Sequence, residues 1–187
     1  VLIDICKNAQ IESCEFVFPE DVKLPGYQPV LRSPKNLVDQ AVELIERAKK
    51  PIILCGHGVL MSKAEEELMQ FAVKTQTPVA STLLGLGAFP ASNELSLGMM
   101  GMHGEVHTNM AIQNSDLILA FGMRFDDRVT GTLKTYAPRA KKIHIEIDPS
   151  EVHKNVFVDV PLVGDLKTVL TDLIPLVDEY DHDEWKQ

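Results

Sequence analysis

Four charged residues follow an apolar run in the middle of the chain: Arg124, Asp126, Asp127 and Arg128, within the string GMRFDDRVTG (residues 122–131). An arginine guanidinium presents a planar fork of donors that matches a phosphate or a carboxylate. Alternating charges can also pair with one another on a surface, where they contribute little energy. Because the string directly follows a predicted buried strand, we favour an anion-binding site over a surface network.

A second candidate is the triplet Gly56, His57 and Gly58, which follows the apolar run at residues 51–55. Glycines let the backbone approach a ligand closely and adopt a positive φ. The triplet is equally compatible with an ordinary turn from a strand into a helix. It is not the GxGxxG fingerprint, so a standard NAD site is not indicated.

The Gly-rich string GMMGMHGEVHTNMAI (residues 98–112) carries His103 and His107. Their spacing fits one face of a helix, but a zinc site needs a third ligand, and HGEVH replaces the usual HExxH motif. A loop and a helix N-terminus that approach an anionic cofactor fit the string better than a metal site does. The structural alternative is a Gly-rich turn with a methionine packed in the core.

Carboxylates follow the two last apolar runs of the chain. Glu146 and Asp148 end the run in HIEID, and Asp165 follows Gly164. A carboxylate at such a strand end commonly binds a ribose hydroxyl or an adenine edge. The structural alternative is helix capping, by Asp148 or Ser150 in the first case and by Asp165 in the second.

Short apolar runs that alternate with helical patterns must position these residues. We predict strands at residues 51–55, 78–81, 116–121, 142–147 and 160–163, each ended by a turn residue. Helices are predicted to begin after Ser33, with Pro34 at the first helical position, and at residues 62–75, 105–114 and 165–177. In the second helix, Ser62 and Glu65 have the spacing of a capping box.

Strands that are apolar throughout and alternate with helices indicate a parallel sheet that is covered on both faces. We therefore predict an α/β fold, a three-layer Rossmann-like parallel sheet flanked by helices. Such sheets bind ligands at the carboxyl ends of their strands. Those ends hold the candidate residues named above.

Composition narrows the class of protein further. The 187 residues are 45% hydrophobic and 24% charged, with a net charge of −9 and no cluster of Lys and Arg, so nucleic acid is not an expected partner. No apolar run approaches the roughly 20 residues needed to cross a membrane. The three cysteines form no CxxC pair, which favours a reducing cytoplasm over a disulfide framework.

Five strings together resemble the central domain of the catalytic (large) subunit of acetohydroxyacid synthase (acetolactate synthase), within the thiamine-diphosphate-dependent enzymes. They are PVASTLLGLGAFP (78–90), LSLGMMGMHG (95–104), SDLILAFGMRFDDRVTG (115–131), HIEIDPSEVHKN (144–155) and VGD (163–165). The string GMRFDDRVTG is highly specific for that family. The resemblance implies an enzyme that condenses two pyruvates, or pyruvate and 2-oxobutanoate, in branched-chain amino-acid biosynthesis.

The resemblance also implies FAD as the cofactor of this domain, of the kind called DHS-like. Gly56, His57 and Gly58 would line FAD, and Thr82, Leu83 and Leu84 would lie along the isoalloxazine. The remaining FAD-binding residues would be Met102 and His103 near the flavin, Gly122, Arg124, Asp126, Arg128 and Val129 at the ribityl and phosphate portion, and Glu146, Ile147, Asp165 and Leu166 at the adenosine end.

Two positions depart from the family pattern: His57 stands where a third glycine is usual, and Lys23 stands where an arginine is usual. Lysine keeps the charge of arginine but loses its bidentate fork. The thiamine-diphosphate and magnesium motif of the family, GDG followed by Asn-Asn, is absent from the sequence. The resemblance thus implies that thiamine diphosphate and Mg²⁺ bind outside this fragment and that the fragment alone is inactive.

The resemblance divides the chain into four parts. We expect residues 1–10 to end a preceding pyrimidine-binding domain, with residues 1–5 as a strand, and residues 11–33 to be a linker. Residues 34–178 would form the FAD-binding domain, and the acidic residues 179–187 a loose linker to the thiamine-diphosphate domain. Expected partners are the other domains, further catalytic subunits in a homo-oligomer, and a small regulatory subunit.

Three alternatives stay open. The chain could be the central domain of another thiamine-dependent enzyme, such as a pyruvate oxidase or a glyoxylate carboligase. It could also be a NAD-binding domain of the deoxyhypusine synthase or sirtuin type, which shares the sheet architecture. Finally, it could be a scaffold between subunits that binds neither cofactor.

Overall fold

A parallel sheet forms the centre of the computed structural model, which describes residues 2–19 and 28–186. In this part of the chain the sheet has six strands in the order β3-β2-β1-β4-β5-β6, and every neighbouring pair is parallel. The strands are β1 (Pro51–Cys55), β2 (Val79–Ser81), β3 (Ser96–Met99), β4 (Leu117–Phe121), β5 (Lys141–Glu146) and β6 (Val160–Val163).

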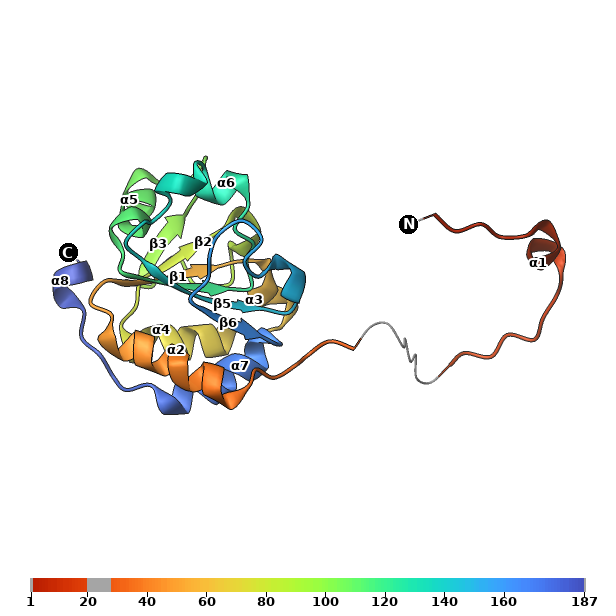
Figure 1. Cartoon of the computed structure of the whole chain (residues 1–187), viewed down its shortest axis with the longest axis horizontal. Coiled ribbons are helices and arrows are strands. Elements are labelled where there is room, and N and C mark those ends of the chain that lie inside the picture. The colour runs from red at the N-terminus through yellow and green to blue at the C-terminus, as the bar shows by residue number, and fades with distance from the viewer. Residues whose placement is uncertain (1, 20–27, 187) are drawn as a thin grey trace.

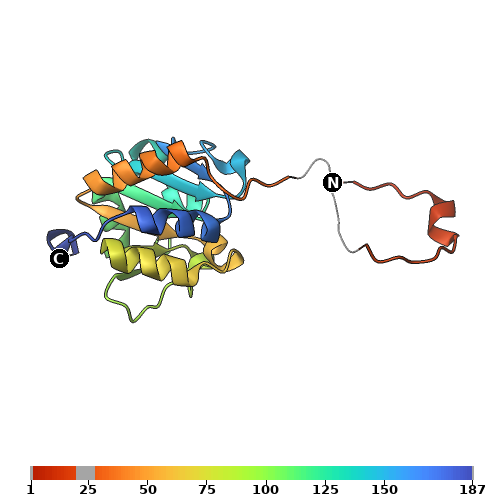
Figure 2. The same cartoon turned by 90° about the horizontal axis from the view of Figure 1, so that it is seen from below.

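Helices cover both faces of the sheet. On one face α2 (Lys35–Arg47), α7 (Leu166–Leu173) and α4 (Glu65–Thr75) lie side by side, as Figure 2 shows. On the other face lie α5 (Val106–Asn114) and α6 (Asp127–Thr130) (Figure 1). Because side chains alternate along a strand, β4 sends Leu119 and Phe121 into the first core and Ile118 and Ala120 into the second. The predicted three-layer fold is confirmed.

Short helices complete the described chain. They are α1 (Lys7–Ile11), α3 (His57–Met61), η1 (Leu83–Gly85), η2 (Leu133–Thr135), η3 (Pro149–Glu151), η4 (Ile174–Leu176) and α8 (Asp183–Lys186). The sequence-based prediction lacks the edge strand β3 and several of the short helices, among them α3. The edge strand β3 is half-buried, and its sequence SLGM includes a serine and a glycine. It therefore lacks the continuous apolar run by which the other strands were predicted. Helix α3 spans five residues, too few for a helical period to emerge.

The structure corrects two of the predicted helix caps. Ser62 ends α3, and its hydroxyl donates to Asp165 and accepts from the Lys167 amide, so the predicted capping box is wrong. Ala64 stands at the N-cap of α4 instead. The hydroxyl of Ser33 donates to the Val163 carbonyl, and Pro34 stands at the N-cap of α2. Both serines tie distant segments together.

Two carboxylates cap helices, as the structural alternatives to ligand binding predicted. The Asp148 carboxylate accepts from the Ser150 amide at the start of η3. The Asp165 carboxylate accepts from the Thr168 amide at the start of α7.

The two terminal segments also differ from prediction. Residues 2–5 form no strand, and α1 lies in a segment for which no helix was predicted. The acidic tail is not wholly loose, because the Trp185 indole donates to the Pro51 carbonyl at 2.8 Å, which places α8 at the amino end of β1 (Figure 1). Within the described residues, no helix combines the length and the apolar character that crossing a bilayer requires.

Candidate functional site at the carboxyl edge

A cavity of about 790 Å³ opens at the carboxyl edge of the sheet. It lies where the strand order reverses, because the chain proceeds from β1 to β2 on one side and crosses back to β4 on the other. The lining residues come from the ends of five strands: Gly56, His57, Gly58, Thr82, Leu83, Leu84, Met99, Met100, Met102, His103, Gly122, Met123, Arg124, Asp126, Arg128, Val129 and Glu146.

Two glycine-containing turns meet backbone to backbone in this cavity. The Gly58 amide donates to the Gly122 carbonyl at 2.8 Å, and Gly122 has φ +56°. A Cβ atom on Gly58 would lie 2.6 Å from the Gly122 Cα, so a side chain there would push the turns apart. His57 stands between two such glycines, but its side chain is exposed and lines the cavity. A side chain at residue 57 is therefore compatible with the fold.

Positive charge comes from the segment after β4. The side chain of Arg124 is 63% exposed, and its Nη2 atom lies 3.6 Å from the Asp126 carboxylate. That carboxylate also accepts from the Arg128 amide at the start of α6, so Asp126 serves partly as a helix cap. Arg128 points one guanidinium nitrogen toward the Met102 sulfur at 3.9 Å. Two guanidinium groups thus remain available to an anion in the cavity.

Apolar side chains form another part of the lining. Leu83, Leu84 and Met102 are 70%, 65% and 59% exposed, high values for large apolar residues. Leu83 and Leu84 stand in η1, which Thr82 caps by accepting from the Gly85 amide at 3.0 Å. An apolar surface beside two arginines suits a ligand that has both an apolar ring system and a charged portion.

The loop that carries Met102 and His103 is fixed from α5. The Asn109 side chain accepts from the Gly101 amide and donates to the Gly101 carbonyl, each at 2.9 Å. The Met102 amide donates to the Arg128 carbonyl at 2.8 Å, which joins this loop to α6. Asn109 is absent from our predicted site, because its role depends on a contact that the sequence does not reveal.

Glu146 closes the cavity at the end of β5. Its Oε1 atom accepts from the Ile147 amide at 2.9 Å and from the Asp148 amide at 3.3 Å. Burial raises the pKa of the Glu146 carboxyl, and these two hydrogen bonds oppose the rise. The group is thus a buried acceptor at the predicted ribose position.

Three predicted residues lie outside the cavity lining. Leu166 is buried in the core, and Ile147, which follows Glu146, is 42% exposed. Burial raises the pKa of Asp165, but hydrogen bonds from Ser62 and Thr168 outweigh it and leave the pKa below its ordinary value. The Asp165 carboxylate is thus engaged within the protein. The other predicted residue of interest, Lys23, lies outside the described residues.

Metal-binding residues do not gather in the described part of the chain, where no three His, Cys, Asp or Glu side chains form a candidate metal site. His107 lies on α5 and hydrogen-bonds through Nε2 with the Leu97 carbonyl at 3.1 Å. His103 lies on the preceding loop and lines the cavity. The two histidines therefore do not share a helical face.

The fold and the cavity together define a Rossmann-like α/β domain that can hold a ligand at its topological switch point. Residues 38–173 match the family model described as thiamine pyrophosphate enzyme, central domain. Because this match covers more than half of the chain, the chain belongs to that family.

Three of the proteins that the chain resembles are named as acetolactate synthase large subunits. The chain is 51% identical over 174 residues to the acetolactate synthase large subunit of Corynebacterium glutamicum, covering 93% of this chain and 28% of that protein. It is 45% identical over 177 residues to the probable acetolactate synthase large subunit of Methanocaldococcus jannaschii, covering 93% and 30%. It is 42% identical to the acetolactate synthase large subunit of Haemophilus influenzae, covering 96% of this chain and 32% of that protein. The chain spans less than a third of the length of these relatives.

Proposed function

We propose that the cavity binds FAD and that the chain is the central domain of an acetolactate synthase large subunit. The observation that carries this proposal is the convergence of the 56–58 turn, the apolar 82–84 segment and the 122–129 segment on one cavity. Residues far apart in the sequence thus meet at one cavity, which supports an extended ligand such as a flavin nucleotide. The relatives' shared name supports the choice of enzyme.

We propose a place along the cavity lining for each portion of FAD. Leu83, Leu84 and Met102 would contact the isoalloxazine, because they expose apolar area beside the carboxyl ends of β2 and β3. Arg124 and Arg128 would hold the phosphates by charge-assisted hydrogen bonds. Glu146 would accept a hydrogen bond from a ribose hydroxyl at the adenosine end of FAD. Asp165 and Leu166 stay predictions, because a bonded carboxylate and a buried side chain offer little to adenosine.

In the whole protein, we propose that two pyruvates, or pyruvate and 2-oxobutanoate, are joined to acetohydroxy acids for branched-chain amino-acid synthesis. FAD would do no net redox work there. Thiamine diphosphate and Mg²⁺ would bind outside this chain, so this chain alone would be inactive. Asp127 and Met102 would border the substrate channel. Further catalytic subunits, a small regulatory subunit and a cytoplasmic location complete the proposal.

Titration of the chain with FAD and with NAD, followed by flavin and protein fluorescence, tests the binding step. We expect saturable binding of FAD and none of NAD. Tight binding of NAD without FAD would contradict the proposal and favour a NAD-binding domain. Binding of neither, here and in the whole protein, would favour a scaffold.

An activity assay of the whole protein tests the choice of enzyme. With thiamine diphosphate, Mg²⁺ and FAD, we expect acetolactate to form from pyruvate. Oxygen consumption with pyruvate, or condensation of glyoxylate, in place of acetolactate formation would instead identify a pyruvate oxidase or a glyoxylate carboligase.

A further inference from the structure

The segment at residues 122–125, which carries Arg124, has no regular secondary structure of its own. At its start, the Gly122 amide donates to the Ile145 carbonyl at 2.9 Å, and the Gly122 carbonyl accepts from Gly58. These bonds fix the first residue but not the path of the chain through Arg124. Further contacts must set that path.

Two side chains supply those contacts. His144 Nε2 bonds to the Met123 carbonyl at 2.8 Å, and Asn155 Nδ2 donates to the Phe125 carbonyl at 2.9 Å. Met123 and Phe125 are the immediate neighbours of Arg124. The carbonyls on both sides of Arg124 are therefore held from outside the segment, one from β5 and one from the loop before β6.

His144 is an unexpected residue at its position. It is 0% exposed in the second core, with the Phe125 ring edge-on at 5.1 Å. Its Nδ1 atom is buried without a hydrogen-bond partner among the described residues. Because a carbonyl only accepts, the proton must sit on Nε2. Phenylalanine would fill the space without leaving a polar atom unpaired, so core packing alone does not explain the histidine.

We propose that His144 and Asn155 are positioning residues that fix the two carbonyls flanking Arg124 and thereby direct its guanidinium into the cavity. This inference rests on the proposed function, since it treats Arg124 as a ligand for the flavin phosphates. Neither residue lines the cavity, so we assign their effect to the backbone of residues 122–125. His144 Nε2 also lies 3.9 Å from the Glu146 carboxylate, a second contact that the Arg124→Ala background below separates from positioning of Arg124.

Two variants remove the donors: His144→Phe keeps a ring of similar size, and Asn155→Leu keeps the approximate volume. Each should weaken FAD binding about 3- to 10-fold, the equivalent of one ordinary hydrogen bond. His144→Gln, whose amide nitrogen reaches the place of Nε2, should restore most of the affinity. As a matched control, Tyr136→Phe removes a buried hydroxyl beside Phe125 that has no hydrogen-bond partner in the described part of the chain, and it should leave the affinity unchanged.

A double-mutant cycle separates positioning from general damage to the domain. In an Arg124→Ala background, His144→Phe and Asn155→Leu should have little further effect on FAD affinity, because the group that they position is gone. Equal losses with and without Arg124 would overturn the inference. If His144→Phe does not fold, Asn155→Leu carries the cycle, since Asn155 stands in an exposed loop outside the core.

Hydrogen exchange of the ligand-free chain distinguishes failure of this inference from failure of FAD binding. Residues 122–131 contain the hydrogen-bonded amides of Gly122, Val129 and Thr130. Both variants should speed exchange in this region, and Tyr136→Phe should not. Unchanged exchange would overturn the positioning roles whether or not FAD binds. Faster exchange in a chain that binds no FAD would leave positioning standing and refute the proposed function.

Discussion

The two edges of the sheet use their polar groups in different ways. At the amino edge, the Asp116 carboxylate accepts from the amides of Lys49 and Lys50 at 2.8 and 2.9 Å, and Lys141 pairs with Asp159 at 2.8 Å. At the carboxyl edge, side chains hold the backbone while the guanidinium of Arg128 forms no ion pair within the described residues.

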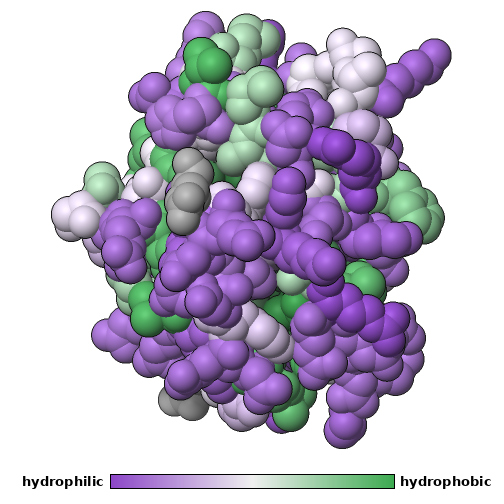
Figure 3. All heavy atoms as spheres, turned by 90° about the vertical axis from the view of Figure 1, so that its left-hand side faces the viewer, coloured by the Kyte–Doolittle hydropathy of each residue, from purple (hydrophilic) through white to green (hydrophobic). Residues whose placement is uncertain are grey.

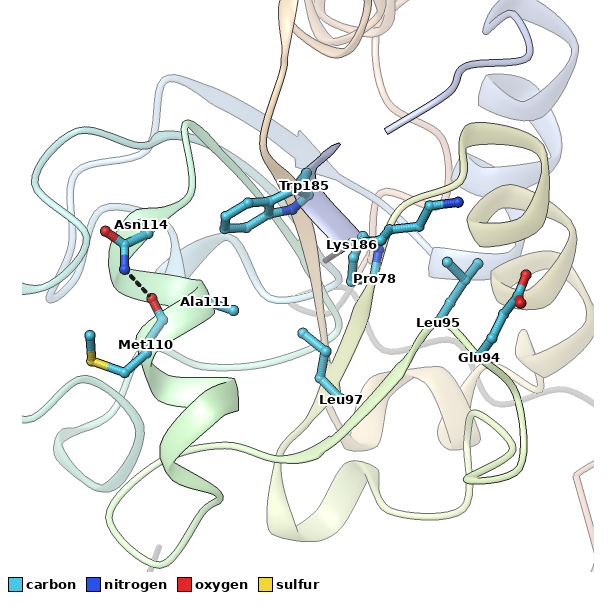
Figure 4. A pocket seen from close by; sticks show the side chains of 9 residues that line it. All are labelled: Pro78, Glu94, Leu95, Leu97, Met110, Ala111, Asn114, Trp185 and Lys186. Carbon is cyan, nitrogen blue, oxygen red and sulfur yellow. Dashed lines mark hydrogen bonds between the residues drawn. The ribbon is translucent and has the colours of Figure 1, made fainter. Parts of the chain in front are cut away.

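The tail strengthens this contrast. Trp185 and Lys186 of α8 lie over the start of β2, opposite Asn114 of α5, and border a small cavity of about 260 Å³ (Figure 4). The face that carries α8 is mostly hydrophilic, with small separate apolar patches (Figure 3). The amino edge is thus satisfied by its own chain, whereas the carboxyl edge retains donors and apolar area for a ligand. The carboxyl edge differs from the amino edge because its backbone is fixed while some of its donors remain available to a ligand.

The largest effect is expected where the carboxyl-edge backbone is tightest. Gly122→Ala should destabilise the domain by about 2–4 kcal/mol and abolish FAD binding, because a Cβ atom would lie 2.6 Å from the Gly58 Cα at a positive φ. Gly131→Ala is the matched control, with φ +58° and nothing within 4 Å of its Cβ atom. Urea unfolding measures both. Equal costs for the two variants would mean that backbone strain, not the close approach, limits residue 122.

Removing the exposed charge of Arg124 should affect binding and spare the fold. Arg124→Ala should weaken FAD binding by about 1.5–3 kcal/mol, the range for a hydrogen bond to a charged group. Arg139→Ala removes an arginine that donates to Asn114 at the amino edge, and FAD affinity should not change. Calorimetric titration measures both variants. Unchanged affinity in Arg124→Ala would show that the guanidinium does not contact the ligand.

The reverse pattern is expected at the amino edge. Asp116→Ala leaves two backbone amides without their acceptor, so the unfolding free energy should fall by about 1–2 kcal/mol. FAD affinity should be unchanged at a temperature where the variant is folded. A loss of affinity as large as that of Arg124→Ala would break the distinction between the two edges.

The smallest effect is a pH dependence from His144. Burial lowers the pKa of its imidazole below 6.5, and this outweighs the Met123 carbonyl and Glu151, which raise it; nearby His153 lowers it slightly further. Below neutral pH the unfolded state therefore binds more protons than the folded state does. The stability that neutral His144 contributes is complete above the pKa of the unfolded state, and it is lost as pH falls through the lowered pKa of the folded state. Unfolding at about pH 7.5 and about pH 5 should show a smaller pH-dependent difference in His144→Gln than in the original chain.

His182 also has a pKa lowered by burial, but it is common to both proteins in that comparison. Identical pH dependences would show that His144 does not contribute.

Local sequence patterns were enough to predict the three layers of the fold and the strand ends from which the cavity is built. The apolar runs predict β1, β4 and β5, and the parallel arrangement brings the strand ends together whatever the intervening chain does. Ser62 shows the limit of such patterns. Its spacing from Glu65 is that of a cap, yet its hydroxyl donates a hydrogen bond to Asp165, 103 residues away. A tertiary partner overrode a sound local signal.

The residues that hold the site were less predictable than those that line it. Asn109 and Asn155 read as ordinary helix and loop residues, and His144 as part of an apolar strand. Their roles depend on carbonyls at residues 101, 125 and 123, which only the folded chain brings near. Because every residue has a backbone carbonyl, the sequence does not indicate which carbonyl accepts a hydrogen bond from a distant side chain. Positioning residues of this kind therefore need a structure to be found.

A crystal structure of the chain with FAD tests the central claim most directly. We predict the isoalloxazine against Leu83 and Leu84, with a phosphate oxygen within hydrogen-bonding distance of the Arg124 guanidinium. FAD bound at the amino edge, or a carboxyl-edge cavity left empty at saturating FAD, would contradict the account.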